Sequence, residues 1–247
     1  MVFHIHLDAA NSILKHHRVH GLLVLPGVAH LSIAYEFAKI IYPFYDLNCI
    51  EDVCWMRPVV CIQDSIDFKL HIAAKNNELR FSFQNYNGQV YSEGRILHKK
   101  WPLKTPQVAH AEFQPSQIVQ KQFIYDEFKK LGINYGESFR CLNNVKIRNN
   151  IGIGEIFSKS TIINFINLLD CSFQSGMAIS LASNFQDLMP VSLGVLEIRD
   201  SIYGTCNHKY YALTHKINQF RTDISVTDEA ENIIICVKDL GIRPGKF

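Results

Sequence analysis

The segment HHRVHGLLVLPGVAHL, residues 16–31, holds residues whose types and spacing could do chemistry. His17 lies four residues before Gly21 and nine before Pro26, just ahead of an apolar stretch with helical spacing. A histidine can act as a general base because its ordinary pKa lies near neutrality. If a helix begins at Pro26 and Gly27, its free backbone N–H groups could stabilise an oxyanion or a polarised carbonyl. We therefore expect a base and an oxyanion site in this segment.

A candidate acid lies far downstream, in the segment LLDCSFQSG. Asp170 and Gln174 are four residues apart, so on a helix they share one face and can hydrogen-bond to each other. Taken alone, Asp170 could equally be a buried structural carboxylate bonded to backbone. The matching histidine favours the catalytic interpretation.

The neighbours of His17 raise the question of a metal site. His16, His17 and His20 form an HHxxH cluster, but Gly21 and Pro26 interrupt a helix there. No third ligand is indicated and an HExxH motif is absent, so we expect no metal. The remaining histidines are interpreted as surface or hydrogen-bonded groups: His4, His6, His30, His71, His98, His110, His208 and His215.

Composition excludes several classes of protein. The chain has 247 residues, 47% of them hydrophobic, which is enough for a full core in one large domain or two small ones. A net charge of +2 gives no basic surplus for a phosphate backbone, so we expect no nucleic-acid partner. Apolar runs fall short of a membrane span, so no membrane is expected. Seven cysteines without CxxC spacing, and a start without a signal-peptide pattern, predict reduced thiols in a cytoplasmic protein.

Short runs with period-two alternation dominate the chain and predict antiparallel sheet. Strands are expected at residues 50–60, 65–73, 79–86, 89–98, 139–147, 154–160, 190–198, 209–217, 220–226 and 232–240. Residues 28–41 and 166–182 instead show helical spacing, and the first of these segments is apolar on most of its helix surface. Such a helix must be buried on more than one side, so we expect a sheet wrapped around each one.

The two halves of the chain repeat one scheme, a long buried helix among four or more strands. Between them, residues 101–116 turn polar and contain three prolines, which predicts a connection. We therefore expect an N-terminal subdomain over residues 1–100, a linker over 101–116 and a C-terminal subdomain over 117–247. The first half would supply the histidine and the Pro-Gly turn, and the second the aspartate and the glutamine.

Several motifs occur together in one order. HRVHGLLVLPG has the form HxxxGxxxxP, LLDCSFQ has the form DxxxQ, and four supporting segments are VCWMRPVV (53–60), YSEGRI (91–96), NYGESFR (134–140) and MPVSLG (189–194). This combination resembles the dehydratase domains of modular polyketide synthases over nearly the whole chain. The chain departs from the family pattern at two places, because Phe165-Ile166 stand where His-Pro is common and His16 stands where an aspartate is common.

The resemblance implies an α+β double hotdog, in which two hotdog folds lie side by side, each an antiparallel sheet wrapped around a central helix. It implies a hydro-lyase that removes water from a β-hydroxyacyl group on an acyl carrier protein, giving an α,β-unsaturated thioester during polyketide chain elongation. The substrate is carried on the phosphopantetheine of the carrier protein, and no other cofactor is implied. The implied partners are the acyl carrier protein, other synthase domains and a second copy in a homodimer.

The reaction can be matched to residues of this chain. His17 would take the α-proton, and Asp170 would protonate the leaving hydroxyl while Gln174 orients it. The residues expected to bind or position the substrate are Gly27, Gln174, Tyr135, Gly21 and Pro26. Because hydroxide is a poor leaving group, Asp170 must be protonated. Burial in an apolar tunnel would raise its pKa and would keep His17 neutral.

Other functions remain open from the sequence: a hotdog isomerase or epimerase, and a non-catalytic scaffold of the synthase. Look-alike domains that shift double bonds tend to replace the motif aspartate or proline, whereas Asp170 and Pro26 are both present. A scaffold would have lost catalytic residues, and none is missing. A hotdog thioesterase gives no reason for pairing His17 with the Pro-Gly turn. The sequence therefore favours the dehydratase.

Overall fold

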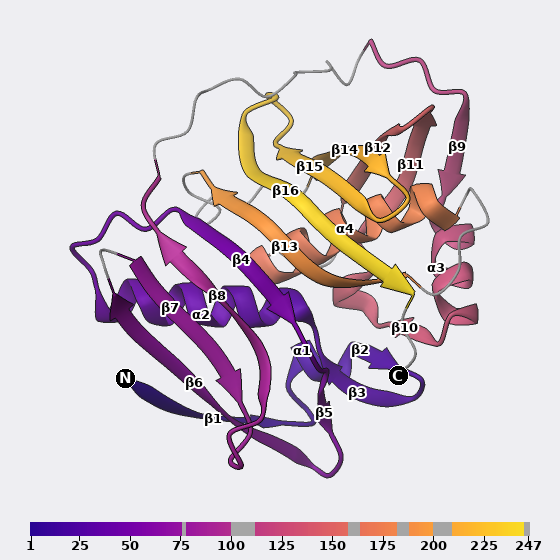
Figure 1. The fold of residues 1–247 in the computed structure, drawn as a ribbon. Coiled ribbons are helices and arrows are strands. Elements are labelled where there is room, and N and C mark those ends of the chain that lie inside the picture. Colours follow the sequence, from indigo (N-terminus) through magenta and orange to yellow (C-terminus); the bar gives the residue numbers. More distant parts are fainter. Residues whose placement is uncertain (76–77, 100–111, 158–163, 182–187, 200–208, 245–247) are drawn as a thin grey trace.

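A long antiparallel sheet runs through the molecule (Figure 1). The computed structural model describes residues 1–75, 78–99, 112–157, 164–181, 188–199 and 209–244. Within these residues the sheet has twelve strands, in the order β1 (Val2–Asp8), β6 (Ser65–Lys75), β7 (Glu78–Gln84), β8 (Val90–Leu97), β4 (Cys49–Trp55), β13 (Leu188–Ile198), β16 (Ile233–Pro244), β15 (Arg221–Thr227), β14 (Lys209–Asn218), β12 (Ile151–Phe157), β11 (Leu142–Arg148) and β9 (Gln117–Gln120).

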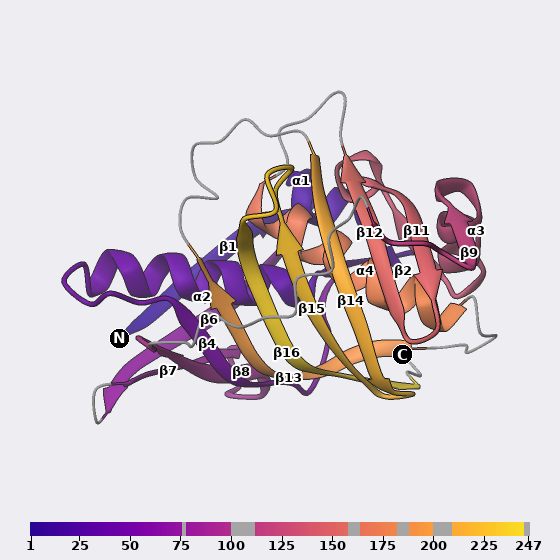
Figure 2. The same ribbon diagram turned by 90° about the horizontal axis from the view of Figure 1, so that it is seen from above.

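Two long helices lie against this sheet, one in each half of the chain. Helix α2 (Gly27–Ile41) packs on β4, β6, β7 and β8, and helix α4 (Phe165–Leu181) packs on β11, β12, β14 and β15. The helices also contact each other, and Figure 2 shows both inside the curve of the sheet. Each half is thus a sheet wrapped around a central helix, which confirms the α+β double hotdog expected from the sequence.

Side-chain alternation explains how these layers form. In β6 the buried residues Ile66, Phe68, Leu70 and Ile72 occupy every second position and face α2, while the intervening residues are more exposed. Helix α4 is buried at every position from 167 to 180 because sheet and helix cover it on several sides. Its polar residues therefore lie in the interior, where each needs a hydrogen-bond partner or a ligand.

Two connections fuse the halves. In the large sheet, β4 from the first half pairs with β13 from the second over the register Cys49↔Glu197 to Cys54↔Ser192. A second sheet has the order β10 (Ile133–Tyr135), β2 (His17–Val19), β3 (Leu22–Leu25) and β5 (Val59–Cys61). Its β10 comes from the second half and its other strands from the first, so this small sheet brings distant segments together.

The structure differs from the expected strand over residues 50–60. The large-sheet strand β4 ends at Trp55, and β5 belongs to the small sheet. Pro58 lies between them, and proline has no N–H to continue a ladder of hydrogen bonds. The prediction of one strand is wrong here because side-chain alternation continues across a bend of the backbone.

Several elements were not predicted. They are β1, α1 (Ser12–Lys15), the short strands of the small sheet, β9, α3 (Lys121–Lys130) and a 3-10 turn, η1 (Glu137–Phe139). The strand expected from residue 139 begins at Leu142 because the 3-10 turn precedes it. Most of the expected linker, together with residues 158–160 and 182 of two expected elements, lies outside the described residues. The subdomain boundaries stay a prediction.

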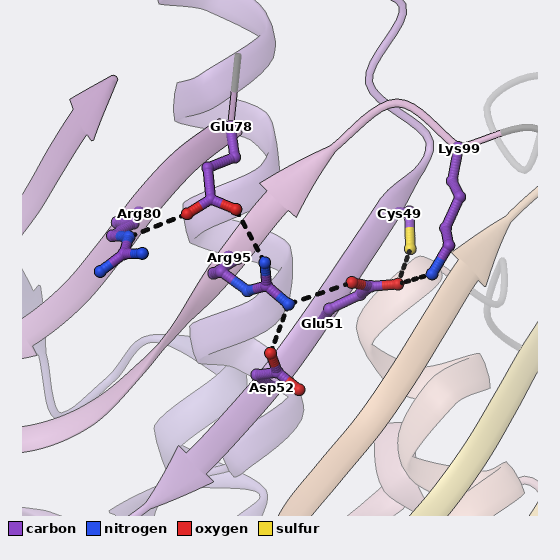
Figure 3. Close-up of polar contacts among 7 residues, drawn as sticks. All are labelled: Cys49, Glu51, Asp52, Glu78, Arg80, Arg95 and Lys99. Atoms are coloured by element: carbon purple, nitrogen blue, oxygen red, sulfur yellow. Dashed lines mark hydrogen bonds and ion pairs between the residues drawn. The ribbon is translucent and has the colours of Figure 1, made fainter. Parts of the chain in front are cut away.

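An ion-pair network covers the outer face of the first half (Figure 3). The Arg95 guanidinium contacts Glu51, Asp52 and Glu78, which joins β8 to β4 and to β7. Glu78 also accepts from Arg80, and Glu51 from Lys99 and the Cys49 thiol. Burial and the Glu51 carboxylate raise the pKa of the Cys49 thiol to about 12, so this thiol is not a nucleophile.

Candidate active site

A cavity of about 370 Å³ lies where the small sheet meets the two long helices. It is lined by residues of β2, β3, β10 and α4, the first turn of α2, the bend between β4 and β5, and the start of β13. Both halves of the chain therefore contribute to it. Three of the predicted functional side chains line this cavity: His17, Tyr135 and Asp170.

His17 is the first residue of β2 and is 8% exposed. Its Nδ1 lies 2.8 Å from the backbone oxygen of Val24 on the neighbouring strand β3. A carbonyl oxygen can only accept, so Nδ1 carries the hydrogen and Nε2 keeps its lone pair. Burial lowers the pKa of His17 to about 4, which keeps the ring neutral near pH 7. The imidazole is thus in the form that a general base requires.

Aromatic side chains fix the plane of the His17 ring. Tyr135 stands opposite His17 in the β2–β10 register, and its ring centroid is 5.5 Å from that of the imidazole in an edge-on arrangement. Phe139 lies 5.8 Å away, also edge-on. The preceding residue strengthens this packing, because His16 Nδ1 lies 2.8 Å from Ser138 Oγ and the His16 carbonyl accepts from the Gly136 N–H at 2.7 Å.

Asp170 lies on α4 and is 8% exposed. Burial raises the pKa of its carboxyl to about 7, while a hydrogen bond from Gln174 lowers it in part. The Gln174 Nε2 donates to Asp170 Oδ2 at 2.7 Å, one helical turn away. Since Oδ2 is engaged as an acceptor, a proton on this carboxyl belongs on Oδ1. Near neutral pH Asp170 is therefore a partly protonated acid.

A buried tyrosine holds the Gln174 amide in one orientation. The second Nε2 hydrogen of Gln174 goes to the Phe139 carbonyl at 3.0 Å, and its Oε1 accepts from the Tyr125 hydroxyl at 2.9 Å. That hydroxyl accepts in turn from the Leu142 N–H at 3.1 Å. Both Nε2 hydrogens and the Oε1 of the amide are engaged, and a flipped amide would place Oε1 against the Phe139 carbonyl oxygen, an acceptor against an acceptor.

Tyr125 was missed by sequence reasoning because α3 was missed. The available signal was the apolar spacing in KQFIYDEFKK, where Ile124, Tyr125 and Phe128 are buried and the charged residues are not. That pattern predicts an amphipathic helix. It does not predict which buried residue reaches Gln174.

Helix α2 begins at the cavity. Pro26 is its N-cap residue, and Gly27 is its first residue, so the Gly27 N–H has no acceptor within the helix. The Gly27 carbonyl accepts from Trp55 Nε1 at 3.1 Å, and a Cβ at position 27 would lie 3.0 Å from that nitrogen. Gly27 itself lines the cavity. Its amide is thus available at the end of the helix where negative charge is stabilised.

Three predicted residues do not line the cavity. Gln174 contacts Asp170, which lines the cavity, and Pro26 is the N-cap residue of α2, which begins at the cavity. Gly21 lies in the turn between β2 and β3, where its φ of +83° requires the left-handed conformation that glycine tolerates. That turn brings the Val24 carbonyl back to His17, so we infer that Gly21 shapes the site without contacting it.

His30 lies at the cavity, although it was interpreted as a surface or hydrogen-bonded residue. It is on α2, 2% exposed, and lines the same cavity as His17. Burial lowers its pKa to about 3, so this ring is also neutral. Its position three residues after Gly27 was the available signal, because one helical turn separates the two.

The described residues contain no group of three or more His, Cys, Asp or Glu side chains arranged to hold a metal. The cysteines among them are free thiols. Within the same part of the chain, no helix has both the length and the apolar character needed to cross a membrane.

Comparison with known proteins finds polyketide synthases among the sequence relatives. Residues 1–87 match the family model described as the polyketide synthase dehydratase domain. The polyketide synthase PksN of Bacillus subtilis (strain 168) is 22% identical over 93% of this chain. The match covers 5% of PksN, so the chain spans about a twentieth of that relative's length.

Solved structures with the same fold include dehydratase domains of polyketide synthases. A trans-AT polyketide synthase dehydratase domain from Brevibacillus brevis superposes with a TM-score of 0.85, at 18% identity, and covers 100% of this chain and 94% of that one. The CurK dehydratase, solved as an inactive mutant with a histidine changed to phenylalanine, gives a TM-score of 0.83 at 18% identity, with coverage of 99% and 91%. These matches show that the chain has the fold of polyketide synthase dehydratase domains and that its residues 1–87 have the sequence features of that family.

Proposed function

We propose that this domain removes water from a β-hydroxyacyl thioester carried on an acyl carrier protein and gives an α,β-unsaturated thioester. One observation carries the proposal. A neutral histidine with a free Nε2 and an aspartate with a pKa of about 7 line the same cavity. Dehydration of such a thioester needs an unprotonated base to take the α-hydrogen and a protonated acid to donate to the hydroxyl.

The proposed step uses the groups as follows. His17 Nε2 takes the hydrogen from the α-carbon, and the electron pair of that bond forms the new double bond. The bond between the β-carbon and its oxygen breaks, and the proton on Asp170 Oδ1 goes to this oxygen, which leaves as water. His17 ends as an imidazolium and Asp170 as a carboxylate, and proton exchange with solvent restores both.

The thioester oxygen gains negative charge as the α-hydrogen is removed. The Gly27 N–H, at the positive end of the α2 dipole, is suited to stabilise this charge. Tyr135 packs against His17, and its hydroxyl would make a hydrogen bond close to the substrate hydroxyl or carbonyl. Gly21, Pro26 and Gln174 would position these groups rather than touch the substrate.

The proposal includes the partners that the resemblance implies. The chain would need no cofactor of its own, because the substrate arrives on the phosphopantetheine arm of the carrier protein. A cavity of about 370 Å³ is in the range that accommodates small organic ligands. Other domains of a cytoplasmic polyketide synthase would be its neighbours, and a second copy would complete a homodimer. The much greater length of PksN supports the presence of neighbouring domains.

The test is incubation with a panel of β-hydroxyacyl thioesters of both β-configurations, with mass detection of the loss of one water. The parent protein should dehydrate at least one member. His17→Ala and Asp170→Asn should each lower turnover by at least about 10²-fold, since each removes a proton-transfer group. Exposed Asp67→Asn is a matched control and should keep the parent rate. Near-parent turnover by Asp170→Asn would remove the acid from the mechanism.

A further inference from the structure

Helix α4 presents one stripe of side chains to the catalytic cavity. Asp170, Phe173 and Met177 line the cavity and are 8%, 3% and 7% exposed. Neighbouring positions of the helix do not line the cavity and have no exposed surface: Cys171, Ser172, Gln174, Ser175 and Ala178. Spacings of three and four residues place the three lining residues on one face of the helix. The surface that Met177 keeps is therefore surface of the cavity, where a ligand can touch it.

The cavity has an exposed end at the bend between β4 and β5. Met56, Arg57 and Pro58 of this bend line the cavity and are exposed. Trp55, which precedes them, donates to the Gly27 carbonyl, so the residue proposed to hold the thioester oxygen lies beside this end. A carrier protein is far too large for a cavity of about 370 Å³ and stays outside it. The free end of the acyl chain therefore points away from the bend, into the buried part of the cavity.

Along α4 the cavity extends in one direction only. No residue of α4 before Asp170 lines it, whereas Phe173 and Met177 after Asp170 do. Met177 stands about 10.5 Å beyond Asp170 along the helix axis. The next residues on the same face, Ser180 and Leu181, do not line the cavity. Along this helix the cavity thus ends at Met177.

Apart from the two proposed proton-transfer residues, the buried part of the cavity wall is apolar. It includes Val28, Phe173 and Met177. His30 also lines the cavity, but its Nδ1 is engaged with Ser92 and its Nε2 has no accessible surface, so it offers no hydrogen bond to a ligand. An oxygen atom on the acyl chain would lose its water here without gaining a partner. This part of the cavity is therefore suited to a hydrocarbon chain.

We propose that Met177 determines substrate specificity by limiting the length of the acyl chain, whose hydrocarbon end packs against its side chain. This inference rests on the proposed dehydratase function. An extended chain advances about 3.5 Å for every three bonds, so the rise from Asp170 to Met177 corresponds to about nine bonds. The methionine side chain occupies part of that path. The preferred substrates thus have fewer than about nine carbons beyond the β-carbon.

The experiment measures kcat/KM for straight-chain β-hydroxyacyl pantetheine thioesters with acyl chains of 4 to 16 carbons. In the parent, kcat/KM should rise with length while each added methylene is buried, and then fall about tenfold or more when the chain exceeds the cavity. Met177→Ala removes three heavy atoms from the end of the cavity, so the fall should move to chains about two carbons longer. Met177→Phe places a larger side chain there and should move the fall to shorter chains.

Two further substitutions serve as controls. Met56→Ala removes the same atoms at the exposed end of the cavity and should leave the length at which kcat/KM falls unchanged. Met177→Leu nearly conserves volume and should keep the parent's length profile. The midpoint of thermal unfolding is measured for each variant, and Met177→Val, which removes fewer atoms, makes the same test if Met177→Ala does not fold.

The outcomes separate this inference from the proposed function. An unchanged length profile in the smaller and the larger variants of Met177 overturns the inference. So does a parent without a fall across the panel, or a shift of the same size in Met56→Ala. Failure of the parent to dehydrate any member overturns the proposed function instead.

Discussion

Burial acts on the two titrating residues of the cavity in opposite directions. It lowers the pKa of His17 to about 4 and raises the pKa of Asp170 to about 7, because in both cases it disfavours the charged form. The same apolar surroundings thus produce a free base and a protonated acid at one pH. No ion pair is needed to set either state, since burial is the largest cause of both shifts.

These shifts predict the pH dependence of the proposed reaction. Below about pH 4 His17 gains a proton and loses its basic Nε2, and above about pH 7 Asp170 loses the proton that the leaving hydroxyl needs. We expect kcat/KM to be level between these values and to fall about tenfold per pH unit on the alkaline side. Steady-state rates from pH 5 to pH 9, corrected for spontaneous thioester hydrolysis, measure this limb.

Variants of the hydrogen bonds that link Tyr125, Gln174 and Asp170 test the direction in which the pKa of Asp170 shifts. The bond from Gln174 lowers the pKa of Asp170, so Gln174→Ala should move the alkaline limb to higher pH while the maximal rate falls about tenfold or more. Tyr125→Phe should shift it in the same direction by less. Tyr35→Phe removes another buried hydroxyl, bonded to the Leu47 carbonyl at 2.7 Å, and should leave the profile unchanged. A rate that rises steadily to pH 9 in the parent would contradict the acid assignment.

Spacing in the sequence was enough to select His17, Asp170 and Gln174, because their motifs are short and each acts through its own side chain. It was not enough for Tyr125 and His30. The contacts of these two depend on which atoms they meet across the fold, Gln174 Oε1 in one case and Ser92 Oγ in the other. Such contacts leave no periodic signal in the chain.

Among the elements, the two long helices were predicted closely, and the strands of the small sheet were not. Residues 28–41 and 166–182 were expected as helices, and the structure has them at Gly27–Ile41 and Phe165–Leu181. Their apolar surface is long enough to show a clear period. The strands of the small sheet have three or four residues each, too few to display alternation, and they owe their pairing to distant neighbours.

The first residue of α2, Gly27, is the site of a test at the scale of one element. Gly27→Ala should disturb the active site because the new Cβ would lie 3.0 Å from Trp55 Nε1, the atom that bonds the Gly27 carbonyl. Alanine is otherwise favoured in a helix, so the free energy of unfolding should change by about 1 kcal/mol or less. Turnover should fall about tenfold or more, since a small displacement of the oxyanion donor is costly.

The measurement is kcat/KM together with the midpoint of thermal unfolding. Gly27→Ala/Trp55→Phe should recover part of the lost rate, because the smaller ring leaves room for the methyl group. If Gly27→Ala keeps full turnover, the Gly27 amide does not have the proposed role. If the double variant is no better than Gly27→Ala, the crowding by Trp55 is not the cause.

At the scale of the whole molecule, the cavity exists only while the two halves are docked. His17 and Gly27 come from the first half, and Tyr135 and Asp170 from the second. The sequence predicted this division of the site between two similar halves. It did not predict how they join, because the β4–β13 pairing and the small sheet are contacts between segments far apart in the chain.

The continuous sheet predicts that both halves unfold together. Leu196 on β13 is fully buried and stands opposite Ile50 on β4, at the joint between the halves. Leu196→Ala should lower the free energy of unfolding by about 2–5 kcal/mol, as a large-to-small change in a packed core does. Calorimetry should show one transition in the parent and one in the variant, shifted to lower temperature, with activity lost over the same range.

Ile62→Ala, at a side chain that is 87% exposed, should change stability by about 0.5 kcal/mol or less. Two separate transitions, only one of them moved by Leu196→Ala, would mean that the halves are independent units and that the cavity depends on a docking contact weaker than the folding of either half.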